Sequence, residues 1–364
     1  MFLHAVARSR SWRRQRWGAA IALTVGLVGC SGNSTPVAES EADAPAEADS
    51  PVVVATTSVL CDLTQQIAET TVALTCLLDP GTDPHTYQVK PSDRQALEQA
   101  DLVLYDGYGS APTLIEMVEG SSTEGTRVAV YEQAVPNPLM SEAHDHDAEA
   151  AHADGDGDSH TEDQEHDEEP SATADGGAAP DPHIWHSATH NAAMASVIAD
   201  RLAEVNPDQA DLYAENASRL ITQFEAIDRW IQTQVATVPA DQRQLVTTHN
   251  SFGYFADAYG FEVKGALSGL STDQKPTPGA LTALVEQVKA AQVPAIFAET
   301  TTNPQLIETV AKDAGVTVAE QPLFVEGPGG PGSAAETMQD VLVMNTCVVV
   351  EALGGSCDRA NAPL

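Results

Sequence analysis

Three histidines and one glutamate stand in predicted loops, at or just after strand-like segments. They are His85, His183, His249 and Glu326. Open α/β sheets bind ligands in the loops at the carboxyl ends of their strands, so these side chains are candidates for one shared site. Three neutral imidazoles and a carboxylate form a closed tetrahedral set that suits Zn²⁺, whereas Mn²⁺ prefers more oxygen ligands. Spacing alone leaves another interpretation open, because a lone histidine in such a loop more often serves only as a hydrogen-bonding residue.

Alternating strands and helices surround these positions. A β-branched run at 52–56 predicts a buried strand, and further strands are expected in both halves of the chain, at 71–78, 102–105, 127–130, 244–248, 261–264, 295–298 and 316–319. Helical segments separate them. This alternation predicts parallel sheets with helices on their faces.

A long helical pattern lies between the two halves. Apolar residues recur near a helical period through 191–238, with an interruption at Pro207, which is best placed in the first turn of a new helix. The second piece, about 28 residues, would be about 40 Å long. The predicted fold class is therefore α/β, with two lobes bridged by a long helix. Two candidate ligands come from each half, so we expect them to meet in the cleft between the lobes.

Composition and charge limit the possible functions. The chain has 364 residues, 42% of them hydrophobic, and a formal net charge of −36. This length suffices for about two domains. The strong negative charge argues against a nucleic-acid partner, because phosphate groups would be repelled.

The first thirty residues have the pattern of an export signal. Five arginines lie within the first sixteen positions, and an apolar run follows at 17–28. That run is too short to span a bilayer as a mature helix. Leu27-Val28-Gly29-Cys30 is similar to a bacterial lipobox, which predicts that Cys30 is acylated and held by membrane lipid. The alternative is an ordinary secretory signal with a chance cysteine. Residues 31–50 contain almost nothing to bury and predict a disordered tether.

Four cysteines remain after Cys30. They are Cys61, Cys76, Cys347 and Cys357. An even number in an exported chain suggests two disulfides, and Cys61–Cys76 with Cys347–Cys357 is the simplest of three connectivities. Four reduced, buried thiols are the alternative.

An acidic, histidine-rich insert occupies residues 141–180. It contains no Lys or Arg and holds five histidines, His144, His146, His152, His160 and His166. It cannot bury a core, so we expect a disordered loop. Because unperturbed imidazoles are mostly neutral above pH 7, the loop is interpreted as an auxiliary, low-affinity metal collector or sensor. A solvated polar spacer is the simpler alternative.

Four motifs together resemble a known family. They are Gly81-Thr82-Asp83-Pro84-His85-Thr86-Tyr87, Pro91-Ser92-Asp93, Asp181-Pro182-His183-Ile184-Trp185 and Thr248-His249-Asn250-Ser251-Phe252-Gly253. The chain from 52 to 353 resembles the cluster A-I metal-binding solute receptors of bacterial ABC importers. The resemblance implies two α/β lobes joined by a rigid helix, with the metal held between them by His85, His183 and His249. It further implies zinc rather than manganese, because histidine stands at 249, where manganese receptors of the family are expected to have glutamate.

Two positions depart from the family pattern, and a third matches it. Glu326 falls where the family commonly has an aspartate ligand, so either its carboxylate or a water completes the metal sphere. His186 replaces a residue that is usually uncharged. We interpret it as a spectator, and a transient ligand at the mouth of the cleft is the alternative. Glu299 matches an acidic residue of the family and is expected to accept a proton from a ligating imidazole.

The resulting prediction is a monomeric extracytoplasmic receptor that delivers Zn²⁺ to the permease and ATPase subunits of an ABC importer. A manganese or iron receptor of the same family is the nearest alternative, and a zinc-dependent hydrolase is a more distant one. We expect a signal peptide at 1–30, a tether at 31–50, an N-terminal lobe at 51–140, the insert at 141–180, the end of that lobe and the linking helices at 181–238, and a C-terminal lobe at 239–364.

Overall fold

The computed structural model describes residues 50–141, 178–273 and 275–364, which belong to one compact unit beginning at Asp49. Cys30 and the five histidines of the insert lie outside the described residues. The expectations for the lipid anchor, the tether and the insert therefore remain predictions. No helix within the described ranges is long and apolar enough to cross a bilayer.

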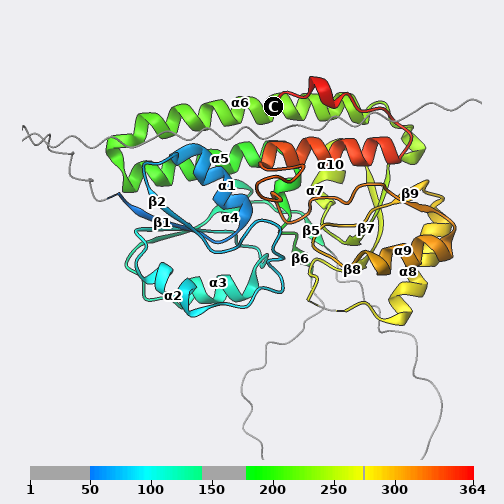
Figure 1. The fold of residues 1–364 in the computed structure, drawn as a ribbon, viewed down its shortest axis with the longest axis horizontal. Coiled ribbons are helices and arrows are strands. Elements are labelled where there is room, and N and C mark those ends of the chain that lie inside the picture. Colours follow the sequence, from blue (N-terminus) through cyan, green and yellow to red (C-terminus); the bar gives the residue numbers. More distant parts are fainter. Residues whose placement is uncertain (1–49, 142–177, 274) are drawn as a thin grey trace, which may run out of the picture. The chain divides into compact units, whose positions relative to one another are not determined.

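The N-terminal lobe is built on a four-stranded parallel sheet with the strand order β2-β1-β3-β4 (Figure 1). Its strands are β1 (Val52–Ala55), β2 (Ala73–Cys76), β3 (Leu102–Tyr105) and β4 (Thr126–Ala129). Four helices connect or follow them, α1 (Ser58–Ala68), α2 (Pro91–Glu98), α3 (Pro112–Glu119) and α4 (Val130–Ala134). Proline opens both α2 and α3, where its missing N–H leaves no helical hydrogen bond unmade.

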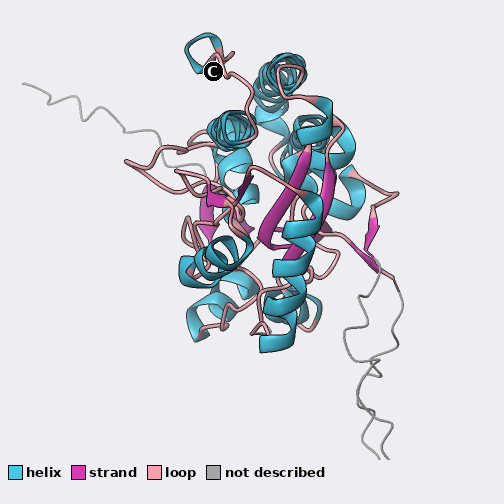
Figure 2. Cartoon of the chain, turned by 90° about the vertical axis from the view of Figure 1, so that its right-hand side faces the viewer, coloured by secondary structure: helices cyan, strands magenta, loops and turns pink. Residues whose placement is uncertain are grey.

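The C-terminal lobe repeats the alternation with two longer and two very short strands. Parallel pairs form between β7 (Gln244–His249) and β8 (Glu262–Ser268), and between β9 (Ala295–Ile296) and β10 (Thr317–Val318). The amide of Phe297 donates to the carbonyl of Val246 at 2.9 Å, which links the two pairs. The helices are α7 (Gly253–Tyr259), α8 (Pro278–Ala291), α9 (Pro304–Ala314) and α10 (Met338–Ala352). Figure 2 shows most of the strands in the interior, with helices on either side.

Two long helices connect the lobes. They are α5 (Ala188–Val205) and α6 (Ala210–Val235), and α6 runs along the upper side of the molecule in Figure 1. Pro207 lies in the short 3₁₀ turn η2 (Pro207–Gln209) that precedes α6. The 26 residues of α6 contact α1 and α5 on one side of the cleft and α7 and α10 on the other. The predicted bridging helix is therefore present, and the chain has the two-lobed α/β fold.

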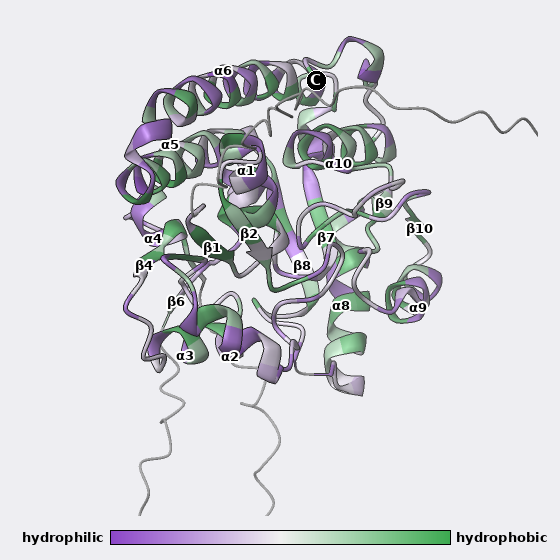
Figure 3. Ribbon diagram, turned by 60° about the vertical axis from the view of Figure 1, so that its left-hand side comes forward, coloured by the Kyte–Doolittle hydropathy of each residue, from purple (hydrophilic) through white to green (hydrophobic). Residues whose placement is uncertain are grey.

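The buried apolar residues form one large cluster that crosses from lobe to lobe and one smaller cluster inside each lobe. Trp185, Phe224 and Phe255 belong to the large cluster, so the helices and both sheets share one core. In Figure 3 the strand β1 is hydrophobic throughout, whereas α6 alternates between hydrophobic and hydrophilic residues. This alternation is typical of a helix with one face on the core and the other in solvent.

Disulfides join the predicted cysteine pairs, Cys61–Cys76 and Cys347–Cys357. The first connects α1 to β2, and the second connects α10 to the C-terminal segment. Two short strands, β5 (Met140–Ser141) and β6 (Ala179–Pro180), lie on either side of the insert in the sequence and pair with each other in antiparallel fashion. The sequence pattern did not predict this pair or α4.

An aspartate of α1 binds the start of α10 and so joins the lobes. The amide of Met338 donates to Asp62 Oδ2 at 2.9 Å, and Gln66 Nε2 donates to the same oxygen at 2.9 Å. Gln66 also exchanges hydrogen bonds with Gln339 of α10. Burial, and to a lesser extent the charge of Asp340, raise the pKa of Asp62 to about 6, although the two hydrogen bonds oppose that shift.

This raised pKa predicts that Asp62 lowers the stability of the fold at neutral pH. The contribution of Asp62 to the free energy of unfolding is most favourable below the pKa that its carboxyl group has in the unfolded chain. It is lost as the pH rises through about 6, the pKa in the folded protein. Asp62→Asn keeps an oxygen for the Met338 amide but does not titrate. Relative to wild type, the free energy of unfolding of the metal-free variant should therefore rise by about 2–3 kcal/mol between pH 4 and pH 7. Urea denaturation across this range tests the prediction. Asp313→Asn, at an exposed position of α9, should leave the pH profile unchanged.

Candidate metal centre

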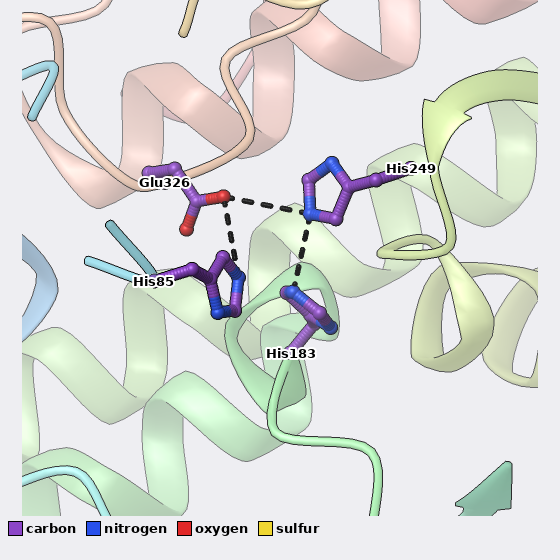
Figure 4. Close-up of side chains that lie close together, drawn as sticks. All are labelled: His85, His183, His249 and Glu326. Carbon is purple, nitrogen blue, oxygen red and sulfur yellow. Dashed lines mark hydrogen bonds and ion pairs between the residues drawn. The ribbon is translucent and has the colours of Figure 1, made fainter. Parts of the chain in front are cut away.

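The four predicted ligands come from four separate segments and face one another between the lobes (Figure 4). His85 lies in the loop between β2 and α2, and His183 directly precedes the 3₁₀ turn η1 (Ile184–His186). His249 is the last residue of β7, and Glu326 lies in the loop between β10 and α10. All four residues are buried, with at most 6% of their surface exposed. The structure thus brings together the residues that the sequence placed far apart.

The distances among these groups match those expected around a single ion. One donor atom from each residue lies within 4.8 Å of all the others. His249 Nε2 is 3.3 Å from His183 Nε2 and 3.5 Å from Glu326 Oε1, and His85 Nε2 is 3.8 Å from that oxygen. Ligands at the corners of a zinc tetrahedron are separated by about 3.3 Å when each lies about 2.0–2.1 Å from the metal. The arrangement needs only small movements to close on a cation.

Two carboxylates orient two of the imidazoles from behind. His249 Nδ1 lies 2.7 Å from Glu299 Oε2, while Glu299 Oε1 accepts the amides of Thr248 and His249 at 2.9 Å. His183 Nδ1 lies 2.8 Å from Asp181 Oδ1, which also accepts the His183 amide at 2.9 Å. A proton held on Nδ1 by a carboxylate leaves the lone pair of Nε2 free for a metal. The expected contact of Glu299 is present, but the equivalent function of Asp181 was not predicted, although Asp181 stands in the same motif as His183.

The other two candidates have no hydrogen-bonding partner within the described residues. This holds for both ring nitrogens of His85 and for both carboxylate oxygens of Glu326. Each buried polar group without a partner costs about 1–3 kcal/mol, and more if it is charged. A bound cation would satisfy the carboxylate and one nitrogen together. This feature distinguishes the cluster from an ordinary network of buried histidines.

The electrostatics of the cluster also favour a cation. Burial raises the pKa of Glu326 to about 8, although His249 acts against that shift. Burial and the neighbouring His183 and His249 lower the pKa of His85 to about 3, and burial also lowers that of His183. For His249, burial lowers the pKa, but Glu299 and Glu326 outweigh it and raise it to about 9. A divalent ion bound at this centre would take the place of the protons on Glu326 and His249, the two groups whose pKa is raised.

Two close backbone contacts position the loops that carry the candidates. Gly327 has φ 108°, and a Cβ there would lie 2.6 Å from Ser58 Oγ, which donates to the Glu326 carbonyl at 2.9 Å. Gly253 opens α7, and a Cβ there would lie 2.5 Å from Asp181 Oδ2. Only glycine permits these approaches without displacement, so both positions help to hold candidate groups in place.

His186 is not part of the cluster. Its ring stacks on Phe252, with the centroids 4.3 Å apart, and its Nε2 has no partner within the described residues. The adjacent Trp185 donates from its indole nitrogen to the Val325 carbonyl at 2.7 Å, next to Glu326. His186 therefore belongs to the packed wall behind the centre, and not to the mouth of the cleft.

A two-lobed α/β chain with an enclosed set of candidate metal ligands between its lobes has the architecture of a metal receptor. Residues 53–352 match the family described as "ZnuA: Zinc-uptake complex component A periplasmic". The chain belongs to this family of receptors for ABC metal importers. It is accordingly an extracytoplasmic binding protein rather than an enzyme, so the hydrolase alternative is excluded.

Relatives of known name and structure are similar over most of the chain. The manganese-binding lipoprotein MntA of Halalkalibacterium halodurans is 30% identical over 302 residues, which are 83% of this chain and 88% of that protein. MntA of Bacillus subtilis is 28% identical over 94% of this chain and 99% of that protein. The solved structure of the periplasmic zinc-binding protein TroA from Treponema pallidum is 26% identical, with a TM-score of 0.70 over 83% of this chain and 99% of that chain.

The hydrogen bond between Glu299 and His249 leads to a testable prediction. Glu299→Gln keeps the shape of the side chain but removes the charge that orients and polarises the His249 imidazole. We expect metal affinity to fall about 10–100-fold while one equivalent still binds. His249→Ala, which removes the imidazole itself, should weaken binding further. Competition titration against a chelating dye measures the metal affinity of each variant. Equal affinity of Glu299→Gln and wild type would show that this hydrogen bond does not affect metal binding.

Proposed function

We propose that this protein captures Zn²⁺ outside the cytoplasm and delivers it to the permease and ATPase subunits of an ABC importer. The proposed ligands are His85, His183, His249 and Glu326. The observation that carries the proposal is that three imidazoles and one carboxylate lie buried within 4.8 Å of one another. The metal is the cargo of such a receptor, so it must be held tightly and later released.

The choice of zinc rests on the chemistry of the donors. Three borderline nitrogen donors and one oxygen suit a tetrahedral Zn²⁺, whereas Mn²⁺ favours sites richer in oxygen. Manganese is the competing candidate, because both MntA relatives are named as manganese-binding lipoproteins. TroA, named as zinc-binding, supports the other choice. Names of relatives therefore favour neither metal, and the ligand set decides our proposal.

The proposed location follows from the start of the chain and from the relatives. The relatives include proteins named as lipoproteins, and Leu27-Val28-Gly29-Cys30 is similar to a lipobox. We propose that acylated Cys30 anchors the receptor to membrane lipid and that residues 31–50 separate it from the anchor. The receptor would work as a monomer with the domain boundaries expected from the sequence.

The metal preference is tested by competition between Zn²⁺ and Mn²⁺ for the metal-free protein. Wild type should bind one equivalent in the cleft and prefer zinc strongly. His249→Glu should move the preference partly towards manganese, because it exchanges a nitrogen donor for a hard oxygen while His85 and His183 remain. His190→Glu is a matched control at a partly buried histidine outside the centre. A wild-type preference for manganese, or a zinc-to-manganese ratio unchanged by His249→Glu, would contradict the proposal for zinc.

The insert is proposed to be a separate, weaker metal collector. Deleting residues 142–177, with β5 and β6 rejoined by a short Gly-Ser linker, should lower the total zinc stoichiometry. Cleft affinity should stay within about twofold, because none of the four candidate ligands is removed. Isothermal titration calorimetry at two protein concentrations separates tight from weak sites. A stoichiometry equal to that of wild type would leave the insert as a polar spacer.

A further inference from the structure

Because the candidate metal centre is enclosed, some part of the chain must move before an ion enters or leaves. His183 and His249 are 0% exposed, Glu326 is 4% exposed and His85 is 6% exposed. Contacts that hold this enclosure shut therefore control the rate of metal exchange. The ligands themselves control how strongly the bound ion is held.

Several contacts between the lobes lie along the helices and do not reach the loops around the centre. Asp62 of α1 accepts the amide that opens α10, and Gln66 pairs with Gln339. Figure 1 shows α10 beside α6 along the upper side, with α8 on the lower side of the C-terminal lobe. The segment that leads into α8, residues 269–273, lies between β8 and α8, away from the joint between α1 and α10.

This segment contacts both loops that carry histidines of the centre. Thr272 Oγ1 donates to Asp83 Oδ2 across the cleft, and Asp83 Oδ1 accepts the backbone amide of His85 at 2.9 Å. On its own side of the cleft, the Gly269 carbonyl accepts the amide of Asn250, next to His249, at 3.0 Å. Within the described ranges, the bond from Thr272 to Asp83 is the only hydrogen bond between residues 269–273 and the N-terminal lobe.

We propose that the hydrogen bond between Asp83 and Thr272 is a latch that sets how fast the metal is released. This inference rests on the proposed metal-receptor function and adds two positioning residues to it. Asp83 is suited to this role because one carboxylate both fixes the His85 backbone and fastens the opposite lobe. A hydrogen bond to a carboxylate is stronger than one between neutral groups, yet a single bond at a half-buried position can still open readily. Breaking it frees the loop of His85 from residues 269–273 without removing a ligand.

The test compares rates of metal release from variants at position 272. Thr272→Val keeps the shape of the side chain but removes the donor, and zinc release into excess chelating dye after rapid mixing should be about tenfold faster. Thr272→Ser keeps the hydroxyl and should release zinc at the wild-type rate. Ser271→Ala is the matched control, because the side-chain hydrogen bonds of Ser271 to described residues all go to Asp273 in the same segment.

A second readout separates the latch from damage to the centre. Thr272→Val should still bind one equivalent of metal, and the absorption spectrum of its Co²⁺ form should equal that of wild type, because all four ligands are retained. A release rate within twofold of wild type would overturn the latch, and so would equal acceleration in Ser271→Ala. Failure of wild type itself to bind one equivalent of Zn²⁺ or Mn²⁺ would instead overturn the proposed function, and the latch with it.

Discussion

A carboxyl group that has no hydrogen-bond partner among the described residues shares one buried space with three imidazoles, and this arrangement constrains the rest of the fold. Water is excluded from Glu326 and His85, so neither group recovers the hydrogen bonds that it would make in solution. A divalent cation offsets that cost, because it gives the carboxylate a charge to neutralise and the nitrogens a lone-pair acceptor. The donors already lie close to one another, since His249 Nε2 is 3.3 Å from His183 Nε2 and 3.5 Å from Glu326 Oε1. Rigid attachment to separate elements keeps them at these distances and prevents a tighter collapse.

The two lobes provide that attachment in similar ways. Parallel strands direct their carboxyl ends towards the cleft, so that His85 follows β2 on one side and His249 ends β7 on the other. Behind the donors, Asp181 and Glu299 each bind an Nδ1 and a backbone amide at once, which fixes both the ring and the loop. The long helix α6 contacts helices of both lobes, and the largest apolar cluster crosses between them. The distance between the donor sets is therefore maintained by packing far from the ion.

Much of this architecture could be predicted because it depends on local patterns. The boundaries of β3 are those of the strand expected at 102–105, and the candidate ligands stand in motifs with recognisable neighbours. Other features depend on contacts between distant residues and leave no local pattern. The antiparallel pair β5–β6 contains only two residues in each strand, so no periodicity can indicate it. The hydrogen bond from Thr272 to Asp83 joins residues 189 positions apart, and Asp62 meets the start of α10 across 276 positions. Neither contact can be seen before the lobes are placed together.

The metal that this centre would prefer depends in part on whether the Glu326 carboxylate binds through one oxygen or through two. Its extra methylene, compared with aspartate, does not carry it past the centre, because Oε1 lies 3.5 Å from His249 Nε2 and 3.8 Å from His85 Nε2. One-oxygen binding completes a tetrahedron with three nitrogens, which suits zinc. Two-oxygen binding would add a fifth donor and an oxygen-richer sphere, which suits manganese better. No hydrogen bond within the described residues holds the second oxygen of Glu326 away from the ion. In the proposed zinc receptor the three imidazoles would therefore bear most of the selection for zinc, and exchanging one of them should affect the metal preference more directly than shortening the carboxylate.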